Sequence, residues 1–465
     1  MKKRYVLVTA LATFSLQLSA QHYADKWYFG SKAGIDFTSG TPVAITNSEL
    51  NTVEGSASIA DPITGALLFY TDGINVWNDN NTLMPNGTGL MGGSSSTQPA
   101  LIVPVPENST QYYIFTTDET GGSLGLRYSI VDMTLDGGNG NVTVKNALLK
   151  TPVVEKITAV EDHGTSNYWL VAHGWGNDSF YSFRISPTGI DSAVVSNVGT
   201  VHDSGVIQNS YGQMKFNPCG NMLALAVGYM DIVEFFDFNI ITGVVSNPRT
   251  ITYSDHVYGI EFSENSNALY VSTYDANGTL MQYDLSITNL GAMIASAAII
   301  SVTTDTYPLQ RGPDGKIYVA KSFSQYLGVI NSPNTIGTGC SYVDMGFDLD
   351  PTFMGFNSAL GLPNFVTSFM GGTANCIGST NGIEEADAPA NVIFPNPSSS
   401  NFTFVSKHNN SSVTVTDISG KVMDAYSNVT NGTEFDFGNN YAPGMYLVTA
   451  TSGNLTSIKK VMKTE

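Results

Sequence analysis

One pattern recurs along the chain: a short apolar strand, a polar turn and a second apolar strand. The first strands of these pairs begin at Trp27, Leu67, Tyr112, Tyr168, Met222, Ala268 and Lys316. Successive starts are 40, 45, 56, 54, 46 and 48 residues apart, which is the spacing expected for propeller blades of four strands. Aromatic and β-branched residues dominate both strands, as packed, pleated sheets favour. The repeat predicts an all-β fold, a seven-bladed β-propeller over residues 21–366.

The first repeat lacks an inner strand of its own. Residues 356–365 align with the inner strands of the other repeats, so we expect this segment to close the ring beside Trp27. A closed ring leaves no open sheet edge to aggregate. The alternatives are a pair of β-sandwiches, a β-helix, or a propeller of six or eight blades, and the blade-length spacing favours the propeller with seven.

The first 20 residues predict export. Lys2, Lys3 and Arg4 precede an apolar run over residues 5–18, and small residues at Ser19 and Ala20 form a cleavage site. The run is too short to span a bilayer as a helix. We interpret residues 1–20 as a signal peptide rather than as a buried helix, and we expect no transmembrane segment in the mature chain.

The mature chain is strongly acidic. It keeps 39 acidic residues but only 17 of the 20 basic ones, so its formal charge moves from −19 to −22. Such a surface repels phosphate backbones, which excludes nucleic acid as a partner. Three cysteines are too few for a disulfide framework. Cys340 and Cys376 are left as a candidate pair, and Cys219 is interpreted as a turn residue.

The C-terminal part changes in character. Residues 367–390 are rich in Gly, Ser, Thr and Asn and predict a linker. Residues 391–465 contain short alternating strands, enough for a small immunoglobulin-like β-sandwich. They include PNPSSSNFTF from Pro395, VTVTDISGKVM from Val413 and YAPGMYLVTATSGNLTSIKKVMK from Tyr441. This part resembles the type A C-terminal sorting domain of proteins that Bacteroidota secrete through the type IX system.

The resemblance implies a route through the periplasm and then through the type IX secretion machinery, to the outer cell surface or the medium. In the family the sorting domain is usually removed, and the cargo is released or attached to a surface glycolipid. The propeller part is similar to repeat regions of surface and gliding-motility-associated proteins of the same bacteria. The residues that match the sorting motifs are Pro395, Asn396, Pro397, Gly420, Gly444, Tyr446, Lys459 and Lys460.

Catalytic candidates are few. The densest polar cluster is Glu161, Asp162 and His163, with His173 ten residues later. Two carboxylates and two imidazoles are able to act as acid, base or metal ligands. Both histidines flank one strand of a hairpin, however, where propeller histidines often bond between strands, so we expect a structural role. We expect no metal and no cofactor; the alternative is a secreted hydrolase or lyase acting on polysaccharide or protein at this cluster.

Loops from every blade converge at the mouth of a propeller's central channel, so a ligand is expected there. The inner strands begin near Glu54, Gln98, Lys156, Tyr211, Tyr258 and Tyr307. Aromatic, amide and charged groups suit a glycan or a peptide, although the tyrosines could instead pack between blades. The sequence therefore predicts a non-catalytic binding protein, secreted or attached to the surface, with a glycan or protein ligand. A purely structural surface component is a third interpretation.

Overall fold

The computed structural model describes residues 22–162, 165–202, 205–274, 278–302, 306–371, 391–407, 409, 411–417, 421–452 and 455–464. The predicted signal peptide, His163, Cys376 and Gly420 lie outside these residues. The chain divides into two compact units, residues 1–376 and 377–465, and each unit is considered by itself.

The first unit is built from antiparallel sheets that follow one another along the chain, seven of them among the described residues. The first sheet contains β1 (Lys26–Phe29), β2 (Ala33–Asp36) and β3 (Val43–Ile45). The second contains β4 (Ala57–Ala60), β5 (Leu67–Thr71), β6 (Asn75–Asn78) and β7 (Leu83–Thr88). The third contains β8 (Ala100–Pro104), β9 (Gln111–Thr117), β10 (Leu126–Asp132) and β11 (Asn141–Lys150).

The next sheets follow the same order. The fourth contains β12 (Val153–Glu161), β13 (Tyr168–Gly174), β14 (Ser179–Ser186), β15 (Gly189–Ile190) and β16 (Val194–Asn197). The fifth contains β17 (Met214–Phe216), β18 (Met222–Val227), β19 (Ile232–Asn239) and β20 (Val244–Thr252). The sixth contains β21 (Val257–Phe262), β22 (Ala268–Thr273), β23 (Thr279–Asp284) and β24 (Ala298–Val302). The seventh contains β25 (Thr306–Arg311), β26 (Ile317–Lys321), β27 (Tyr326–Ile330) and β28 (Tyr342–Asp348).

The helices that the structure describes in this unit are short. They are α1 (Leu290–Ala295) and the 3-10 turns η1 (Asp136–Gly138), η2 (Ile207–Ser210), η3 (Gly228–Met230), η4 (Gly337–Cys340) and η5 (Thr367–Met370). Asn289 caps α1, because its side chain accepts a hydrogen bond from the Ala292 N–H.

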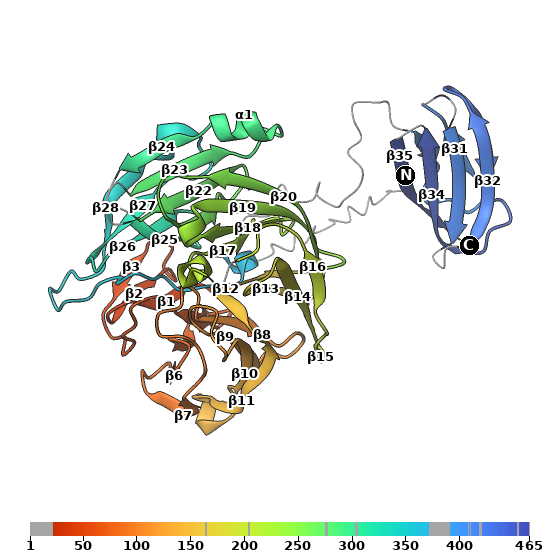
Figure 1. Ribbon diagram of the computed structural model, residues 1–465. Coiled ribbons are helices and arrows are strands. Elements are labelled where there is room, and N and C mark those ends of the chain that lie inside the picture. Colours follow the sequence, from red (N-terminus) through yellow and green to blue (C-terminus); the bar gives the residue numbers. More distant parts are fainter. Residues whose placement is uncertain are drawn as a thin grey trace, which may run out of the picture. The chain divides into compact units, whose positions relative to one another are not determined.

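The sheets surround a common centre, with β11, β16, β20 and β24 at the periphery (Figure 1). Trp27 of β1 packs against Tyr318 of β26 with ring centroids 5.4 Å apart, so the first and last sheets are neighbours. The inner strands are buried along nearly their whole length, as in β8, β12 and β21, which explains their nearly continuous apolar sequences. The predicted all-β, propeller-like fold is confirmed. We interpret the seven sheets as seven blades.

The predicted closing segment lies beside the first sheet. The Ser31 N–H donates to the Asn357 carbonyl at 2.9 Å, and the Asn364 N–H donates to the Ser56 carbonyl at 2.8 Å. The contacts are isolated bridges rather than a continuous strand. The chain then continues into η5, where Phe369 and Met370 are buried with the first unit. Residues 367–370 therefore belong to the first unit, and not to the linker that their composition predicted, because two apolar side chains bury there.

The second unit has two antiparallel sheets among its described residues. One contains β29 (Val392–Phe394), β30 (Phe402–Val405) and β33 (Glu434–Phe437). The other contains β31 (Ser411–Asp417), β32 (Val422–Val429), β34 (Gly444–Ser452) and β35 (Leu455–Lys463). Phe402 and Phe404 from the first sheet share a core with Val413, Val415 and Val448 from the second. The two sheets therefore pack face to face.

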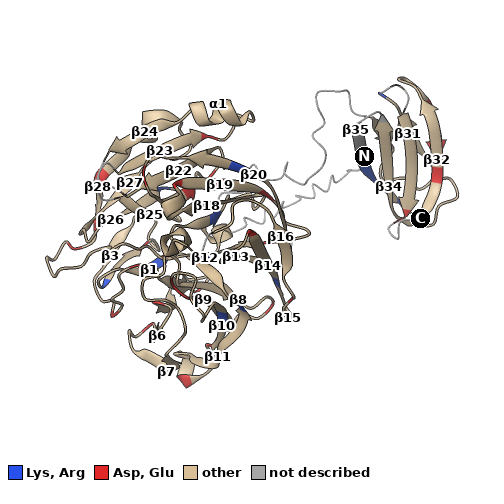
Figure 2. Cartoon of the chain, in the orientation of Figure 1, with Lys and Arg blue, Asp and Glu red and all other residues tan. Residues whose placement is uncertain are grey.

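Two predictions concern thiols and membranes. Cys340 is a free cysteine, buried in η4 beside β24 and β26, so the suggested Cys340–Cys376 pair is not formed. Among the described residues, none of the helices is long and apolar enough to cross a membrane. Figure 2 shows that charged residues are sparse along the described strands and loops of both units, in keeping with a charged fraction of 13%.

Candidate functional site

In an antiparallel sheet, the inner strand begins at the same end of the sheet at which the next strand finishes. The inner strands β4, β12, β17, β21 and β25 all begin at the same face of the first unit, which we call the mouth face. The turns that join each inner strand to its neighbour lie on the opposite face. Glu54, Tyr211, Tyr258 and Tyr307 are next to strand starts, so the fold brings these four predicted residues to the mouth face.

Glu54 and Tyr258 form the centre of this face. The Tyr258 hydroxyl donates to Oε2 of Glu54 at 2.7 Å, and the Ser95 hydroxyl donates to Oε1 at 3.1 Å. Tyr258 is only 4% exposed. Burial raises the pKa of Glu54 from 4.5 to about 7, although both hydrogen bonds favour the ionised form. The centre of the mouth face therefore holds a carboxyl that titrates near neutral pH.

A second carboxyl lies beside it. Glu155 of β12 is fully buried and accepts hydrogen bonds from the Thr97 hydroxyl and the Thr120 N–H, both at 3.1 Å. Burial, and then repulsion by Glu54, raise the pKa of Glu155. The sequence interpretation missed this residue. It lies in VVEKITAVE, a strand buried on both faces, where alternation gives no signal.

Lys156 is placed below the surface rather than at the mouth. Its side chain is fully buried, and Nζ donates to the carbonyls of Tyr211 at 2.9 Å and Ala226 at 2.7 Å. Burial lowers its pKa, while the neighbouring Glu155 carboxylate opposes that shift. Lys156 thus holds the Tyr211 segment in place, which is a positioning role.

A cluster of aromatic rings extends from Tyr258, whose hydroxyl bonds Glu54. The Tyr258 ring lies 5.6 Å from those of Tyr274 and Tyr307, and Tyr274 stacks on Tyr307 at 5.9 Å. The imidazole of His256 stacks on Tyr229 at 3.8 Å. We call these rings, together with Tyr211, the aromatic rim. The rings of Tyr211, Tyr274 and Tyr307 are half-buried, and Tyr229 is 41% exposed.

The histidine of the rim has a carboxylate partner. His256 Nδ1 lies 2.6 Å from Oδ1 of Asp231, the residue that ends η3 in a left-handed conformation with φ 55°. The loop after η3 comes from an adjacent hairpin, so sequence proximity could not identify the partner.

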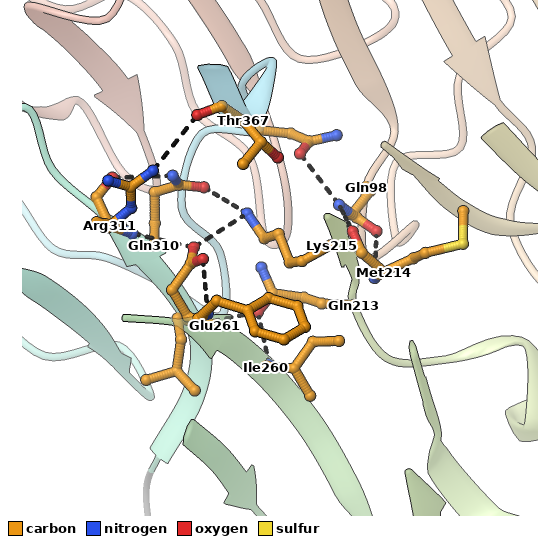
Figure 3. A network of polar contacts seen from close by, with 12 residues as sticks. Gln98, Gln213, Met214, Lys215, Ile260, Glu261, Gln310, Arg311 and Thr367 are labelled. Atoms are coloured by element: carbon orange, nitrogen blue, oxygen red, sulfur yellow. Dashed lines mark hydrogen bonds and ion pairs between the residues drawn. The ribbon is translucent and has the colours of Figure 1, made fainter. Parts of the chain in front are cut away.

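Gln98 lies inside the unit, and both the nitrogen and the oxygen of its side-chain amide form hydrogen bonds. Nε2 donates to the Met214 carbonyl and to Oδ1 of Asn364, and Oε1 accepts from the Met214 N–H at 2.9 Å. Figure 3 shows this amide beside the Met214 backbone. Gln98 therefore ties the third blade to the fifth and to the closing segment, and we leave it out of the site.

A charged network lies deeper in the same region (Figure 3). Nζ of Lys215 is 3.7 Å from Oε2 of Glu261, which also accepts from the Arg311 N–H at 3.1 Å. The Arg311 guanidinium donates to the carbonyls of Thr367 at 3.4 Å, Met370 at 3.3 Å and Gly371 at 3.0 Å. These groups are buried and mutually bonded, so their role is to fasten η5.

The described residues of the predicted catalytic cluster, Glu161, Asp162 and His173, are not brought together, and His163 lies outside the described residues. Glu161 pairs in register with Tyr168, whereas His173 lies five residues further along β13, roughly 17 Å away at 3.3 Å per residue. Asp162 accepts a hydrogen bond from Arg184 at 2.9 Å. Glu161 and Asp162 are therefore on the opposite face, while His173 is at the mouth end of β13.

His173 is a core residue. It is 1% exposed, its Nδ1 is 2.8 Å from the Gly174 carbonyl, and its ring stacks on His202 at 3.9 Å. Burial lowers the pKa of His173 to about 3, and burial also lowers that of His202. Both imidazoles stay neutral at physiological pH. In the part of the chain that the structure describes, no three His, Cys, Asp or Glu residues gather as a metal site.

Among the motif residues of the second unit, Asn396 bonds to β35, an edge strand of its sheet. The Asn396 amide donates to the Lys460 carbonyl and accepts from the Met462 N–H, both at 2.9 Å. Pro395 and Pro397 on either side follow cis peptide bonds. The Tyr446 hydroxyl donates to the Ala442 carbonyl at 2.8 Å, and Gly444 begins β34. Lys459 is half-buried and Lys460 is exposed on β35.

The fold and these motifs define an exported, propeller-like protein with a separate C-terminal unit. Residues 392–464 match the family described as the secretion system C-terminal sorting domain. This part of the chain is a type IX sorting domain, as its motifs predicted. The chain is therefore exported through the type IX system to the cell surface or the extracellular space.

Comparison with solved structures finds several chains of low identity. A candidate 6-phosphogluconolactonase of Bacteroides fragilis is 12% identical, covers 73% of this chain and 97% of its own, and has a TM-score of 0.47. The Pseudomonas aeruginosa periplasmic gluconolactonase PpgL is 10% identical over 70% and 96%, with a TM-score of 0.42. PorZ of Porphyromonas gingivalis, a surface component of the type IX system, is 11% identical over 95% and 70%, with a TM-score of 0.33. A search of curated proteins finds no match.

Proposed function

We propose that the first unit is a non-catalytic binding module that recognises a glycan through the aromatic rim and the Glu54 carboxyl. The observation that carries the proposal is a group of half-buried tyrosine rings that packs on Tyr258, the residue that bonds the partly buried Glu54 carboxyl on the mouth face. Tyrosine rings offer apolar faces to sugar C–H groups, and their hydroxyls and nearby carboxylates bond sugar hydroxyls. Such rings are rigid and cost little conformational entropy on binding.

The two units have separate tasks in this proposal. The second unit directs export, and the first unit binds the ligand once outside. We further propose that the sorting domain is removed after translocation and that the first unit is either released or attached to a surface glycolipid, as the family's route implies.

The proposal is tested with the mature chain on an array of neutral and acidic oligosaccharides, followed by calorimetry with any hit. Tyr229→Ala and Tyr307→Ala should each weaken binding about tenfold, since an aromatic anchor contributes more than about 1 kcal/mol. Tyr342→Ala is the matched control. Tyr342 is also half-buried, but it begins β28 at the opposite face. Equal losses in all three variants, or binding of a protein instead of a glycan, would contradict a glycan site at the rim.

One observation favours a second function, a hydrolase or lyase that acts on a polymeric glycan. The Glu54 carboxyl titrates near pH 7 next to Glu155, and perturbed carboxyls of this kind serve as general acids in glycan-cleaving enzymes. Any glycan that binds should be incubated with the protein and its reducing ends counted. Cleavage that is lost in Glu54→Gln while binding is retained would replace the binding proposal with the enzymatic one.

A further inference from the structure

One turn of the fourth, fifth, sixth and seventh sheets shares a feature that goes beyond the aromatic rim. It follows the second strand of the sheet and lies on the mouth face, because the second strand ends there. Each of these four turns contains one aromatic residue, namely Trp175 after β13, Tyr229 after β18, Tyr274 after β22 and Phe323 after β26. Tyr229 and Tyr274 belong to the aromatic rim, and Trp175 and Phe323 extend it. We call the four residues the aromatic arc.

The corresponding turns of the first three sheets differ in composition. They consist of residues 30–32, 72–74 and 118–125, and their sequences contain no aromatic residue. The sheets follow one another around a common centre (Figure 1), so the four rings lie along one side of the mouth rather than all around it. A ligand that contacts all four rings is therefore elongated and follows the mouth from the fourth sheet to the seventh.

Trp175 forms the first end of the arc. Its half-buried ring lies against Gly121, where a Cβ atom would come within 2.4 Å of the indole, so the absence of a side chain at Gly121 allows the ring to pack there. The next residue back, Thr120, donates its N–H to Glu155 at 3.1 Å. The indole is therefore held in place next to the segment that bonds the buried carboxyl of the mouth face.

The middle of the arc is a continuous series of ring contacts. The imidazole of His256 lies 3.8 Å from the Tyr229 ring and 5.7 Å from the Tyr274 ring, measured between centroids. Tyr274 in turn stacks on Tyr307 at 5.9 Å. Rings that already pack on one another cost little to order when a ligand binds. The fifth, sixth and seventh sheets thus share one preorganised aromatic surface.

Phe323 continues this surface within the seventh sheet. Lys321, two residues before it, pairs in register with Thr306, which is next to Tyr307. The Phe323 side chain is 58% exposed, so most of its surface is accessible to a ligand. Its place in the turn that corresponds to those of Tyr229 and Tyr274 distinguishes it from a singly exposed apolar residue.

We propose that the aromatic arc binds a linear glycan chain of several sugar residues, which lies along the fourth to seventh sheets with its sugar rings on the aromatic faces. This inference rests on the glycan-binding function proposed above and names the class of its ligand, a polysaccharide chain rather than a single sugar. Aromatic faces contact the C–H groups of sugar rings, and each further ring adds a contact only if the glycan is long enough to reach it. Trp175 and Phe323, at the two ends of the arc, therefore determine the preference for chain length.

The first test is calorimetric titration of the mature chain with oligosaccharides of increasing length. The probes are the mono- to hexasaccharides of cellulose, chitin, xylan, mannan and laminarin, and the same lengths of any further glycan that binds on the array. In a series that binds, affinity should rise about tenfold or more from the disaccharide to the hexasaccharide. Affinity that is already maximal for the disaccharide overturns this inference and leaves the glycan-binding function standing, whereas no binding in any series overturns both.

The second test removes the ends of the arc. Phe323→Ala and Trp175→Ala should each weaken binding of the hexasaccharide about tenfold and change binding of the disaccharide less than about twofold. Phe353→Ala is the matched control, because Phe353 is also exposed and left-handed, with φ 57° against 46° at Phe323, but lies in the loop after β28. If Trp175→Ala fails to fold, Phe323→Ala decides, since its ring is exposed. Unchanged hexasaccharide binding in Phe323→Ala, an equal loss in Phe353→Ala, or an equal loss of disaccharide binding would overturn the inference.

Discussion

At the scale of single residues, protonation of the Glu54 carboxyl makes the stability of the first unit depend on pH. Its pKa rises from 4.5 to about 7 on folding because burial disfavours the charge, so the native protein holds this proton more tightly than the unfolded chain does. Between pH 4.5 and 7 the contribution of Glu54 to the free energy of unfolding therefore decreases as pH rises, and above pH 7 it is constant.

Glu54→Gln should remove this dependence, since glutamine is a permanently uncharged analogue of the protonated acid. Relative to the wild type, the variant should be near equal in stability at pH 4.5 and more stable by about 2 kcal/mol at pH 8, with allowance for partial exposure of the carboxyl. Urea unfolding of both proteins at four pH values measures the difference. A difference that is constant with pH would show that the pKa of Glu54 is not raised.

The sequence could identify a site residue where its position at the start of a strand sets its place in the fold. It could not do so where a partner far away in the chain sets that place. Glu54 and Tyr258 were identifiable because each sits at the start of an inner strand, where the fold must place it at the mouth face. Gln98 met the same criterion, but its amide bonds Asn364, which lies 266 residues away in the chain. Contacts formed only by ring closure leave no local pattern, so the interior role of Gln98 could not be predicted.

At the scale of elements, the strand repeat could be predicted because the first strand of each predicted pair is short, apolar and bounded by a turn. The starts predicted at Leu67, Tyr168 and Met222 coincide with those of β5, β13 and β18. η5 was missed. Its sequence, Thr-Ser-Phe-Met, looks like the polar stretch that follows it, and only tertiary contacts with Arg311 and β12 fix it as a turn.

The attachment of η5 to Arg311 predicts a large loss of stability in Arg311→Met. The change removes the donors of three carbonyls and one member of a buried charge network, which typically costs about 3 kcal/mol or more. Arg249→Met is the control, because Arg249 pairs with Asp237 at the surface and should cost less than about 1 kcal/mol. Equal losses in urea unfolding would contradict a fastening role for Arg311.

At the scale of the whole molecule, the two units have separate hydrophobic cores. Phe402, Val413 and their neighbours form the core of the second unit, and none of them belongs to a core cluster of the first. Because burial of each core is self-contained, removal of one unit should not unfold the other.

Deletion of residues 391–465 should therefore abolish export and leave the first unit folded. The truncated protein is expected in the periplasm. Its thermal unfolding midpoint should lie within a few degrees of the midpoint of the first unit in the full chain. Cell fractionation and digestion of intact cells by an added protease measure location. Asn396→Ala provides a milder change, because it removes both side-chain bonds to β35 and costs about 1–2 kcal/mol in the second unit. Asn440→Ala, at an exposed position of the same unit, is its control. The truncated chain at the cell surface would contradict the assignment of export to the second unit, and an unfolded truncated chain would contradict the independence of the two cores.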